Sequence, residues 1–353
     1  MAVTYSVLFI NEKYSCKSIK VLGGIIMHQS KAKITAIGSY VPQHIMTNQQ
    51  LEKIVDTNDE WIVSRTGIRE RRIADQHEYT SDLGYEAVLD LMQRYNKTVD
   101  DVDMIITCTF TPDFKTPSSA NLIQAKLGIK QSGAIDLNAA CAGFTYGLHM
   151  ANALISSGLH KKVLVIGAET LSKVTDYTDR STCILFGDGG GAMLVEYDEH
   201  DPSFIAYHLD SEGDKSHNLY CTGLSSSMNE QQLEATEKIV QNGREVYKWA
   251  VTSVIKGIST LLHNADMTLQ QMNWFVPHSA NLRMIESICD RIKFPLENTL
   301  YSLVKYGNTS SATIPLAIDL AVKENKLKKD EHLLLYGFGG GLTQAGIVIK
   351  WTL

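Results

Sequence analysis

Two long segments of the sequence repeat one order of predicted elements, and this repeat constrains the fold more than any other feature. "DMIITCTFTPDFKTPSSANLIQAKLGI" and "MNWFVPHSANLRMIESICDRI" each predict a strand, a proline-containing loop, a Ser-Ala-Asn triplet and a helix. The triplets occupy residues 119–121 and 279–281. A repeat of this kind indicates that one structural unit occurs twice in the chain.

The parallel continues after the triplets. A helix of small residues follows in each half, in "NAACAGFTYGLHMANAL" and "GNTSSATIPLAIDLAV", and then a strand, a glycine cluster and a second strand. Alternating strands and helices predict a layered α/β architecture. We therefore expect two copies of one α/β unit, residues 27–200 and residues 201–353, whose equivalent loops can meet at a pseudo-twofold axis.

Residues 1–26 stand apart from this repeat. The strand-like pattern begins only at Lys33, after an internal Met27. The Leu-Gly-Gly shortly before Met27 can be encoded by a sequence that contains a bacterial ribosome-binding site. We expect residues 1–26 to be a translated leader and Met27 to be the natural start; the alternative is a genuine but loosely attached N-terminal arm.

The composition argues against several classes of protein. Of the 353 residues, 44% are hydrophobic and 20% are charged, which suits a globular protein with a large core. The net charge of −6 argues against general binding to nucleic acid or to an anionic membrane. No apolar stretch is long enough to predict a membrane span. The six cysteines form no CxxC pair and lack metal-ligand spacing, so we expect reduced thiols, no metal and a cytoplasmic location.

Cys141 is the first candidate for chemistry. No Asp, Glu, Lys or Arg occurs between Asp136 and Lys161, so the helix in this stretch should be central and buried. A thiol in the first turn of such a helix would lie near the positive end of the helix dipole, which lowers the thiol pKa and favours a nucleophile. The alternative is a small core hydrophobe, the usual role of a buried cysteine.

His278 and Asn308 are candidates because of their places in the repeat. His278 follows a predicted strand in "WFVPHSANLRM", and Asn308 precedes a predicted helix in "YGNTSSA". Each has a structural alternative, a hydrogen-bonded loop histidine for His278 and a helix N-cap for Asn308. If the two halves meet at the axis, Cys141, His278 and Asn308 could form a nucleophile with two hydrogen-bonding partners.

Two glycine clusters, residues 187–192 and 337–343, lie between predicted strands in the two halves. Neither has the spacing of a dinucleotide fingerprint, and neither has the lysine of a P-loop. Glycines also allow backbone N–H groups to approach a reacting oxygen closely. This pattern favours an oxyanion hole over a phosphate site.

Taken together, these motifs strongly resemble the condensing enzymes of the thiolase superfamily, and specifically the 3-oxoacyl-[acyl-carrier-protein] synthase III family. The resemblance runs from about Lys33 to the C-terminus, through "NDEWIVSRTGIRERR", "DLNAACAGFTYGL", "DRSTCILFGDGGGAMLVE", "PHSANLRM", "YGNTSSATIP" and "GFGGGLTQAG". It implies a thiolase-like fold, an internally duplicated five-layer α-β-α-β-α architecture.

Differences from related families support this assignment. Degradative thiolases have a second catalytic cysteine in the last loop, and "GFGGGLTQAG" has none. Elongating synthases use Cys-His-His, whereas Asn308 stands at the position of their second histidine. Plant-type polyketide synthases have a proline in the final glycine loop, where this chain has only glycine. The initiating synthase is the best match.

The resemblance implies a decarboxylative Claisen condensation that initiates fatty acid synthesis. Cys141 would take the acyl group of an acyl-CoA, and malonyl-acyl-carrier protein would then enter. His278 and Asn308 would donate hydrogen bonds to the thioester oxygen as carbon dioxide leaves, and the backbone N–H groups of Cys141 and Gly340 would form the oxyanion hole. Decarboxylation supplies the carbanion, so neither a metal nor a bound prosthetic group is expected.

The resemblance also implies binding residues. Trp61 and Arg180 match the pair that holds the CoA adenine between them, and Arg65 and Thr66 accompany them. Without the resemblance, Trp61 would be read as helix-surface packing.

A second set of positions matches the face that docks the acidic carrier protein: Lys248, Arg283 and Arg291. Taken alone they look like ordinary solvated helix charges. Asp290 and Arg291 stand where some relatives have two lysines, which predicts a weaker carrier face here.

The resemblance predicts a homodimer and bears on the primer. Thr116, before the proline of "KTPSSAN", matches a residue that caps the acyl pocket of the partner subunit. Relatives selective for acetyl-CoA often have Phe at this position, so we expect a roomier pocket that accepts branched or longer primers. Other functions stay open: a condensing enzyme of secondary metabolism, a cysteine hydrolase with the same Cys-His-Asn order, or a non-catalytic acyl-binding scaffold.

Overall fold

The structure is a computed structural model, and it describes residues 21–22, 25–26 and 29–353. The predicted extension, residues 1–26, lies outside the described residues except for two short strands. These are β1 (Val21–Leu22) and β2 (Ile25–Ile26), which pair antiparallel.

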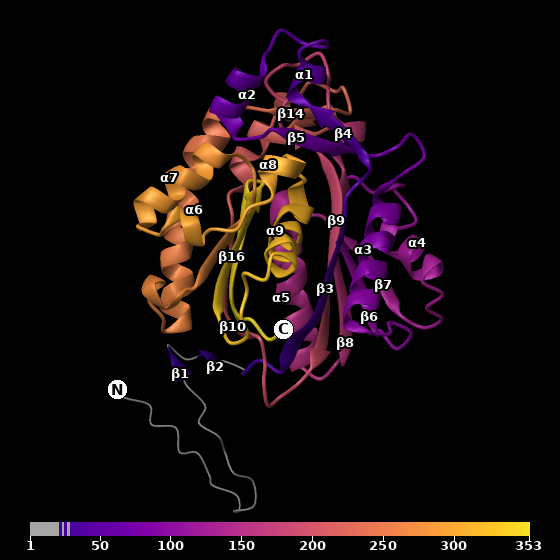
Figure 1. Cartoon of the computed structure of the whole chain (residues 1–353), viewed down its shortest axis with the longest axis vertical. Coiled ribbons are helices and arrows are strands. Elements are labelled where there is room, and N and C mark those ends of the chain that lie inside the picture. The colour runs from indigo at the N-terminus through magenta and orange to yellow at the C-terminus, as the bar shows by residue number, and fades with distance from the viewer. Residues whose placement is uncertain (1–20, 23–24, 27–28) are drawn as a thin grey trace, which may run out of the picture.

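Two sheets and three layers of helices form the body of the molecule (Figure 1). From left to right in Figure 1 the layers are helices α6 and α7, one sheet, the central helices α5 and α9, the second sheet, and helices α3 and α4. The five-layer α-β-α-β-α architecture expected from the sequence is therefore confirmed.

The first sheet belongs to the N-terminal half. Its strand order is β3-β9-β8-β6-β7, with β6 parallel to both β7 and β8 and the other pairs antiparallel. Strand β8 is buried along its whole length, as expected for a strand covered by helices on both faces. The strands are β3 (Ala32–Tyr40), β6 (Met104–Cys108), β7 (Gly133–Leu137), β8 (Lys162–Thr170) and β9 (Asp188–Tyr197).

The second sheet repeats this arrangement in the C-terminal half. Its order is β10-β17-β16-β15, with β15 parallel to β16 and the other pairs antiparallel. Where the first sheet has β7, the second has a single bridge between Phe275 and Thr299. The strands are β10 (Phe204–Ser211), β15 (Trp274–Pro277), β16 (His332–Gly339) and β17 (Thr343–Lys350).

The parallel registers show which residues of the two halves are equivalent. Met104 pairs with Val163 in the first sheet, and Trp274 pairs with Leu333 in the second. Cys108 lies four residues after Met104, and His278 lies four residues after Trp274. Cys108 and His278 therefore occupy equivalent positions at the C-terminal ends of β6 and β15.

The central helices pack between the sheets, as the uncharged sequence of the first one predicts. Phe144 and Leu148 of α5 and Ile314 of α9 join one buried cluster with strand residues of both halves. The helices of the three layers are α3 (Thr80–Tyr95), α4 (Ser119–Lys126), α5 (Gly143–Ser156), α6 (Gly243–Ala265), α7 (Leu282–Ile292) and α9 (Thr313–Lys323).

Shorter elements gather mainly at one end of the sheets, at the top of Figure 1. They include the antiparallel pair of β4 and β5, in which α1 packs against β4 and α8 against β5. They are α1 (Asn48–Leu51), α2 (Asp59–Thr66), α8 (Leu303–Tyr306), β4 (His44–Thr47), β5 (Glu70–Ile73), β11 (Leu219–Cys221), β12 (Ser227–Met228), β13 (Gln231–Gln232) and β14 (Ile239–Gln241).

Short 3₁₀ turns connect these elements, and two of them build the site: η1 (Ala140–Ala142) and η6 (Ser310–Ala312). They precede the central helices α5 and α9 and lie against each other. In the described part of the chain, no helix combines the length and the apolar character that a bilayer crossing requires.

Candidate active site

Cys141 lies in η1, between the end of β7 and the start of α5. The preceding Ala140 has a positive φ of 44°, a conformation that costs energy for a residue with a Cβ. Cys141 is buried, with 8% of its surface exposed, and it lines a large cavity of the molecule. Backbone strain of this kind is often found where a functional side chain is held in place.

The glycine loop after β16 approaches the thiol closely. A Cβ on Gly339 would lie 2.9 Å from Sγ of Cys141 and 2.8 Å from its Cβ, too near for any side chain. Glycine at this position therefore lets the backbone pass against the sulfur. The next residue, Gly340, directs its backbone N–H at the sulfur, as does Cys141 itself.

The structure corrects the expectation that a helix dipole lowers the pKa of Cys141. Burial is the dominant effect and raises the pKa of this thiol to about 12. Hydrogen bonding with the Ser310 side chain opposes this shift, the charge of Glu169 adds to it, and the two backbone N–H groups oppose it. Cys141 also precedes the first residue of α5, Gly143, and belongs to η1. The resting sulfur is a protonated thiol.

His278 stands at the exit of β15 and is 2% exposed. Its backbone N–H donates to the carbonyl of Tyr336 at 2.8 Å, which fixes the chain, and its ring packs edge-on against Phe338. Burial lowers the pKa of His278 to about 3, so the imidazole is neutral.

The hydroxyl of Thr313 decides which nitrogen of His278 has the proton. Its Oγ1 lies 2.8 Å from Nδ1 of His278 and 2.8 Å from the carbonyl oxygen of Ser310. The hydroxyl has one proton, and the carbonyl can only accept, so both contacts are satisfied when Thr313 donates to Ser310 and accepts from Nδ1–H. We assign this tautomer to the resting site. For Nε2 of His278 to donate a hydrogen bond, the ring must adopt the other tautomer, and the Thr313 hydroxyl must then donate to Nδ1.

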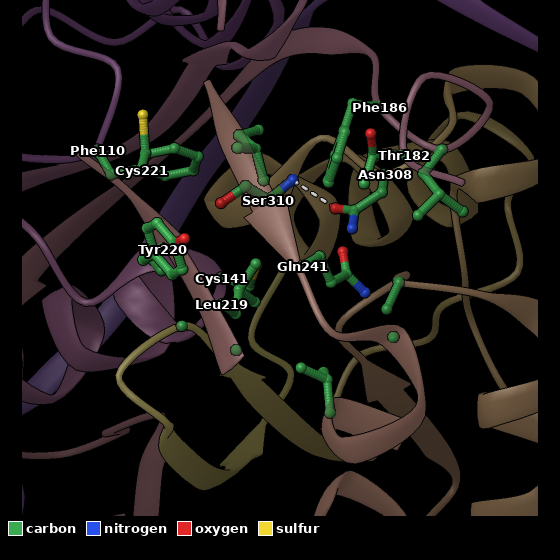
Figure 2. Close-up of a pocket in the computed structure, with 18 of the residues that line it drawn as sticks. Phe110, Cys141, Thr182, Phe186, Leu219, Tyr220, Cys221, Gln241, Asn308 and Ser310 are labelled. Carbon is green, nitrogen blue, oxygen red and sulfur yellow. Dashed lines mark hydrogen bonds between the residues drawn. The ribbon is translucent and has the colours of Figure 1, made fainter. Parts of the chain in front are cut away.

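Asn308 lies between α8 and η6 and is 6% exposed. Its backbone bonds to Leu185 and Gly187, and its Oδ1 accepts the N–H of Ser310 at 2.8 Å (Figure 2). This Asx turn resembles the capping role that was the structural alternative for Asn308. Because Oδ1 is occupied, the amide is oriented with its two Nδ2 donors in the cavity that Asn308 lines.

The two halves build this part of the site in the same way. Ala140 N–H donates to Oδ1 of Asn138 at 3.3 Å, as Ser310 N–H does to Asn308, and Ser310 has a positive φ of 50° beside the 44° of Ala140. The motifs "NAACA" and "NTSSA" thus form the same local backbone structure, once in each half, and face each other across the pseudo-twofold axis.

Glu169 was missed by the sequence analysis. It lies near the end of β8 with no exposed surface, and it accepts hydrogen bonds from Thr109, Phe110, Thr111 and Ser310. Burial raises its pKa to about 7, against these hydrogen bonds. A carboxylate inside the apolar run "KVLVIGAET" was the available signal, because carboxylates are seldom fully buried without a purpose.

Cys141, His278, Asn308 and Gly340 all line one cavity of about 2280 Å³. Apolar walls near Cys141 come from separate segments, among them Phe110, Phe186, Leu219 and Phe338; Figure 2 shows the first three of these around the site. The cavity is thus assembled from both halves of the chain and is large enough to hold an extended ligand.

The charged residues that line the cavity are mainly cationic, although the whole chain has a net charge of −6. Eight cations and four carboxylates take part, which favours an anionic ligand. Sequence analysis did not single out Lys173, Lys238 and Arg244. The cations are Arg65, Lys115, Lys173, Lys238, Arg244, Lys248, Arg283 and Arg291, and the carboxylates are Asp113, Glu237, Glu286 and Asp290.

The residues expected to bind CoA lie together. The guanidinium of Arg180 lies 4.5 Å from the centre of the Trp61 ring, and that of Arg65 lies 5.9 Å away. Arg180 also pairs with the exposed Asp56 at 3.6 Å. Thr66 is buried, and its hydroxyl donates to the carbonyl of Ile62, so towards a ligand it can only accept. An adenine held between Trp61 and Arg180 would have to separate them.

The residues expected to dock a carrier protein are exposed and line the same cavity. Lys248 pairs with Glu245 at 2.6 Å, and Arg291 donates to the carbonyl of Val251 at 3.1 Å. Thr116 is exposed in the loop after β6 and is absent from the lining of this cavity, whereas its neighbour Lys115 contributes to it.

Comparison with protein families gives two matches along the chain. Residues 135–213 match the family described as 3-oxoacyl-[acyl-carrier-protein (ACP)] synthase III. Residues 262–351 match the C-terminal domain of the same family. The first segment contains Cys141, and the second contains His278 and Asn308.

Similar proteins extend the match over nearly the whole chain. A beta-ketoacyl-[acyl-carrier-protein] synthase III 2 of Halalkalibacterium halodurans is 70% identical over 326 residues, 92% of this chain and 98% of that protein. The protein of the same name from Bacillus subtilis is 60% identical over 322 residues, 91% of this chain and 99% of its own length.

Solved structures of similar proteins have the same fold. A beta-ketoacyl-[acyl-carrier-protein] synthase III from Thermus thermophilus has a TM-score of 0.87 at 42% identity and covers 90% of this chain and 99% of its own. The priming beta-ketosynthase of the R1128 polyketide pathway has a TM-score of 0.85 at 32% identity, with 94% and 99% coverage.

Proposed function

Because this chain belongs to the 3-oxoacyl-[acyl-carrier-protein] synthase III family, we propose that Cys141, His278 and Asn308 perform its condensation chemistry. The chain is a condensing acyltransferase that initiates fatty acid synthesis. The observation that supports the residue assignment best is their convergence: three side chains from separate segments of both halves line one cavity, beside the N–H groups of Cys141 and Gly340.

In the first step, Cys141 attacks the thioester carbon of an acyl-CoA and CoA leaves. The negative charge that develops on the thioester oxygen is stabilised by the N–H groups of Cys141 and Gly340, which already face the sulfur. Gly339 permits this approach, because a side chain there would strike Sγ. The product is an acyl-cysteine.

In the second step, malonyl-acyl-carrier protein enters and loses carbon dioxide. The oriented Nδ2 group of Asn308 donates to the thioester oxygen as the enolate forms. His278 donates from Nε2 in the tautomer whose proton is on Nε2, in which Thr313 turns its hydroxyl proton to the unprotonated Nδ1. The carbanion then attacks the acyl-cysteine and gives 3-oxoacyl-carrier protein. Decarboxylation generates the nucleophile, so the reaction needs neither a metal nor a prosthetic group.

The cationic lining of the cavity suits both substrates. Trp61, Arg65, Thr66 and Arg180 hold the CoA nucleotide, with the adenine between Trp61 and Arg180. Lys248, Arg283 and Arg291 attract the acidic carrier protein to the same opening. Asp290 beside Arg291 weakens this face.

The working enzyme is a homodimer with a roomy acyl pocket. Strand β7 is the edge of the first sheet and has β6 as its neighbour, which leaves its other side available for a second copy. Thr116 is exposed and so can reach the partner's pocket, where its small side chain leaves space for branched or longer primers. Rates with acetyl-, isobutyryl- and hexanoyl-CoA test this; a strict preference for acetyl-CoA would refute it.

The reaction takes place in the cytoplasm. Cys108, Cys141, Cys183, Cys221 and Cys289 are free thiols, as in a reducing compartment. The R1128 relative makes a role in secondary metabolism the second candidate function. Its 32% identity, against 60–70% for the beta-ketoacyl synthases, favours fatty acid synthesis.

One experiment separates the proposal from its alternatives. Enzyme is mixed with acyl-CoA alone, and free CoA and the mass of the protein are followed. We expect one CoA released per active site and an acyl adduct that is absent from Cys141→Ala. A hydrolase would release CoA continuously, and a binding scaffold would release none; either result would overturn the proposal.

A further inference from the structure

Glu169 is a buried acid that the chemistry above does not use. Its Oε2 accepts hydrogen bonds from the hydroxyls of Thr109 and Thr111 at 2.8 and 2.6 Å, and from two backbone N–H groups. Its Oε1 accepts from the hydroxyl of Ser310 at 3.1 Å and shares the N–H of Phe110 at 3.4 Å. One oxygen is thus saturated by the segment after β6, and the other faces η6.

Ser310 connects this acid to the nucleophile. Its hydroxyl donates to Oε1 of Glu169 at 3.1 Å, and hydrogen bonding with the same side chain opposes the rise in the pKa of Cys141, whose turn η1 packs against η6. Its position is held by its backbone, because Asn308 accepts its N–H at 2.8 Å and Thr313 donates to its carbonyl at 2.8 Å. Figure 2 shows Cys141, Ser310 and Asn308 in the same pocket.

A single hydroxyl between a thiol and a carboxylate supports two proton arrangements. In the resting one, the thiol donates to Ser310 and Ser310 donates to Glu169. In the other, Glu169 is protonated and donates to Ser310, and Ser310 donates to a thiolate. Moving between them shifts one proton across each of two hydrogen bonds.

We propose that Ser310 and Glu169 form a proton relay that removes the proton of Cys141 as it attacks the acyl-CoA. The inference rests on the proposed function of Cys141 and deepens it. In this relay Ser310 exchanges a proton with the reacting sulfur, whereas Glu169 acts through Ser310 as a positioning residue that holds the proton.

The step balances in protons and electrons. As the new S–C bond forms, the carbonyl electron pair moves to oxygen, the thiol proton passes to Ser310, and the proton of Ser310 passes to Glu169. When the bond between the acyl carbon and the CoA sulfur breaks, the CoA thiolate takes a proton from Ser310, which recovers its own from Glu169. The net change is transfer of one proton from Cys141 to CoA.

The electrostatics of the site agree with this role. Burial raises the pKa of Cys141 to about 12, so its proton needs an acceptor during attack, and burial raises the pKa of Glu169 to about 7, so this acid can hold a proton near neutrality. Glu169 is faced by β6 and residues 109–111, by η6 and by η1. These segments contain no Lys, Arg, His or other carboxylate; their titratable groups are the thiols of Cys108 and Cys141.

The rate of acylation should depend on the ionisation of Glu169. The relay works when Glu169 is ionised, since only the carboxylate can receive the proton. The rate of acylation should therefore rise as the pH increases through about 7 and level off above it. A residue that merely supported the fold would not place an inflection there.

Two substitutions interrupt the relay with little change in packing. In Glu169→Gln the amide oxygen can replace Oε2 and keep its donors, while the amide N–H₂ replaces Oε1 and donates to Ser310, which blocks proton acceptance. Ser310→Gly removes the hydroxyl at a residue with φ of 50°, where glycine is favoured. Asp188→Asn is the matched control, because Asp188 is also fully buried and accepts from Ala74 and Ser172 away from the thiol.

The experiment measures the pre-steady-state burst of CoA and acyl adduct across pH in full-length enzyme. We expect Glu169→Gln and Ser310→Gly to slow the burst about 10²-fold, as loss of general-base assistance does, and to remove the inflection. Asp188→Asn should keep the wild-type profile. Release of carbon dioxide from malonyl-carrier protein, measured with each substitution added to Cys141→Ala, should stay unchanged.

The results that would contradict the relay differ from the result that would contradict the proposed function. If both variants acylate with the wild-type rate and pH profile, the relay is wrong, and a loss confined to His278→Ala would assign the proton to His278. If carbon dioxide release falls as much as acylation, the two residues act on the whole site and the relay is also wrong. If wild-type enzyme forms no acyl-cysteine, the proposed function itself fails.

Discussion

Oδ1 of Asn308 accepts the backbone N–H of Ser310 at 2.8 Å, and this contact orients two groups at once. It turns the amide N–H₂ of Asn308 into the cavity. It also holds Ser310 in a left-handed conformation, where its hydroxyl reaches Glu169. One short Asx turn thus positions both the donor for the second step and the relay for the first.

Asn308→Asp tests the donor without removing the turn. Aspartate keeps an oxygen for Ser310 N–H but has no N–H₂ group. We expect normal formation of acyl-Cys141 and a decrease of about 10²–10³ in the rate of malonyl decarboxylation, as for loss of one oxyanion donor. Asn308→Ala should also impair acylation, because it releases Ser310. Equal loss of both steps in Asn308→Asp would contradict the assignment.

Thr313→Val tests the link between Thr313 and His278. The buried carbonyl of Ser310 and Nδ1 of His278 lose their common partner, so we expect a loss of about 1–3 kcal/mol in the free energy of unfolding. Decarboxylation should slow more than acylation, because no proton can be turned to Nδ1. Thr313→Ser retains the hydroxyl and is the control; identical kinetics for Val and Ser would disprove the link.

Gly339→Ala tests the close approach to the nucleophile. The added Cβ would lie 2.9 Å from Sγ of Cys141, so we expect slower alkylation of Cys141 by iodoacetamide, slower CoA release and a stability loss of about 1–3 kcal/mol. Gly213→Ala is the control, because a Cβ added there would meet nothing within 4 Å. Unchanged reactivity in Gly339→Ala would mean that the loop does not contact the thiol.

Trp61→Ala tests the nucleotide site. Stacking of a base on an aromatic ring contributes about 1–3 kcal/mol, so the KM for acyl-CoA should rise about tenfold. The KM for the matching acyl-pantetheine, which lacks the adenine, should not change. A similar increase for both substrates would show that Trp61 supports the fold of α2 and does not bind adenine.

The carrier face should respond to charge and salt. Lys248→Glu and Arg283→Glu should raise the KM for malonyl-carrier protein several-fold, and added salt should raise it for the wild type, because screening weakens exposed charges. Lys329→Glu makes the same change in net charge at an exposed residue outside the cavity. If Lys329→Glu has an equal effect, the net charge of the protein is responsible and the docking face is wrong.

The repeat in the sequence was sufficient to predict the strands, the helices and two copies of one α/β unit, and the family resemblance implied the five layers. Runs such as "KVLVIGA" and "HLLLYGF" became β8 and β16, and the uncharged stretch after Cys141 became the central helix α5. These features depend on local patterns of apolar and small residues, which are visible in one dimension. The same repeat pointed to Cys141, His278 and Asn308.

The tertiary structure alone decided how these residues are charged and connected. The sequence predicted a thiol made acidic by a helix dipole, but Cys141 precedes α5 and burial raises its pKa to about 12. Glu169, Ser310 and Thr313 could not be connected to the site from spacing, because they come from β8, η6 and α9. Desolvation and hydrogen bonding depend on which groups meet in space, and the order of residues along the chain does not contain that information.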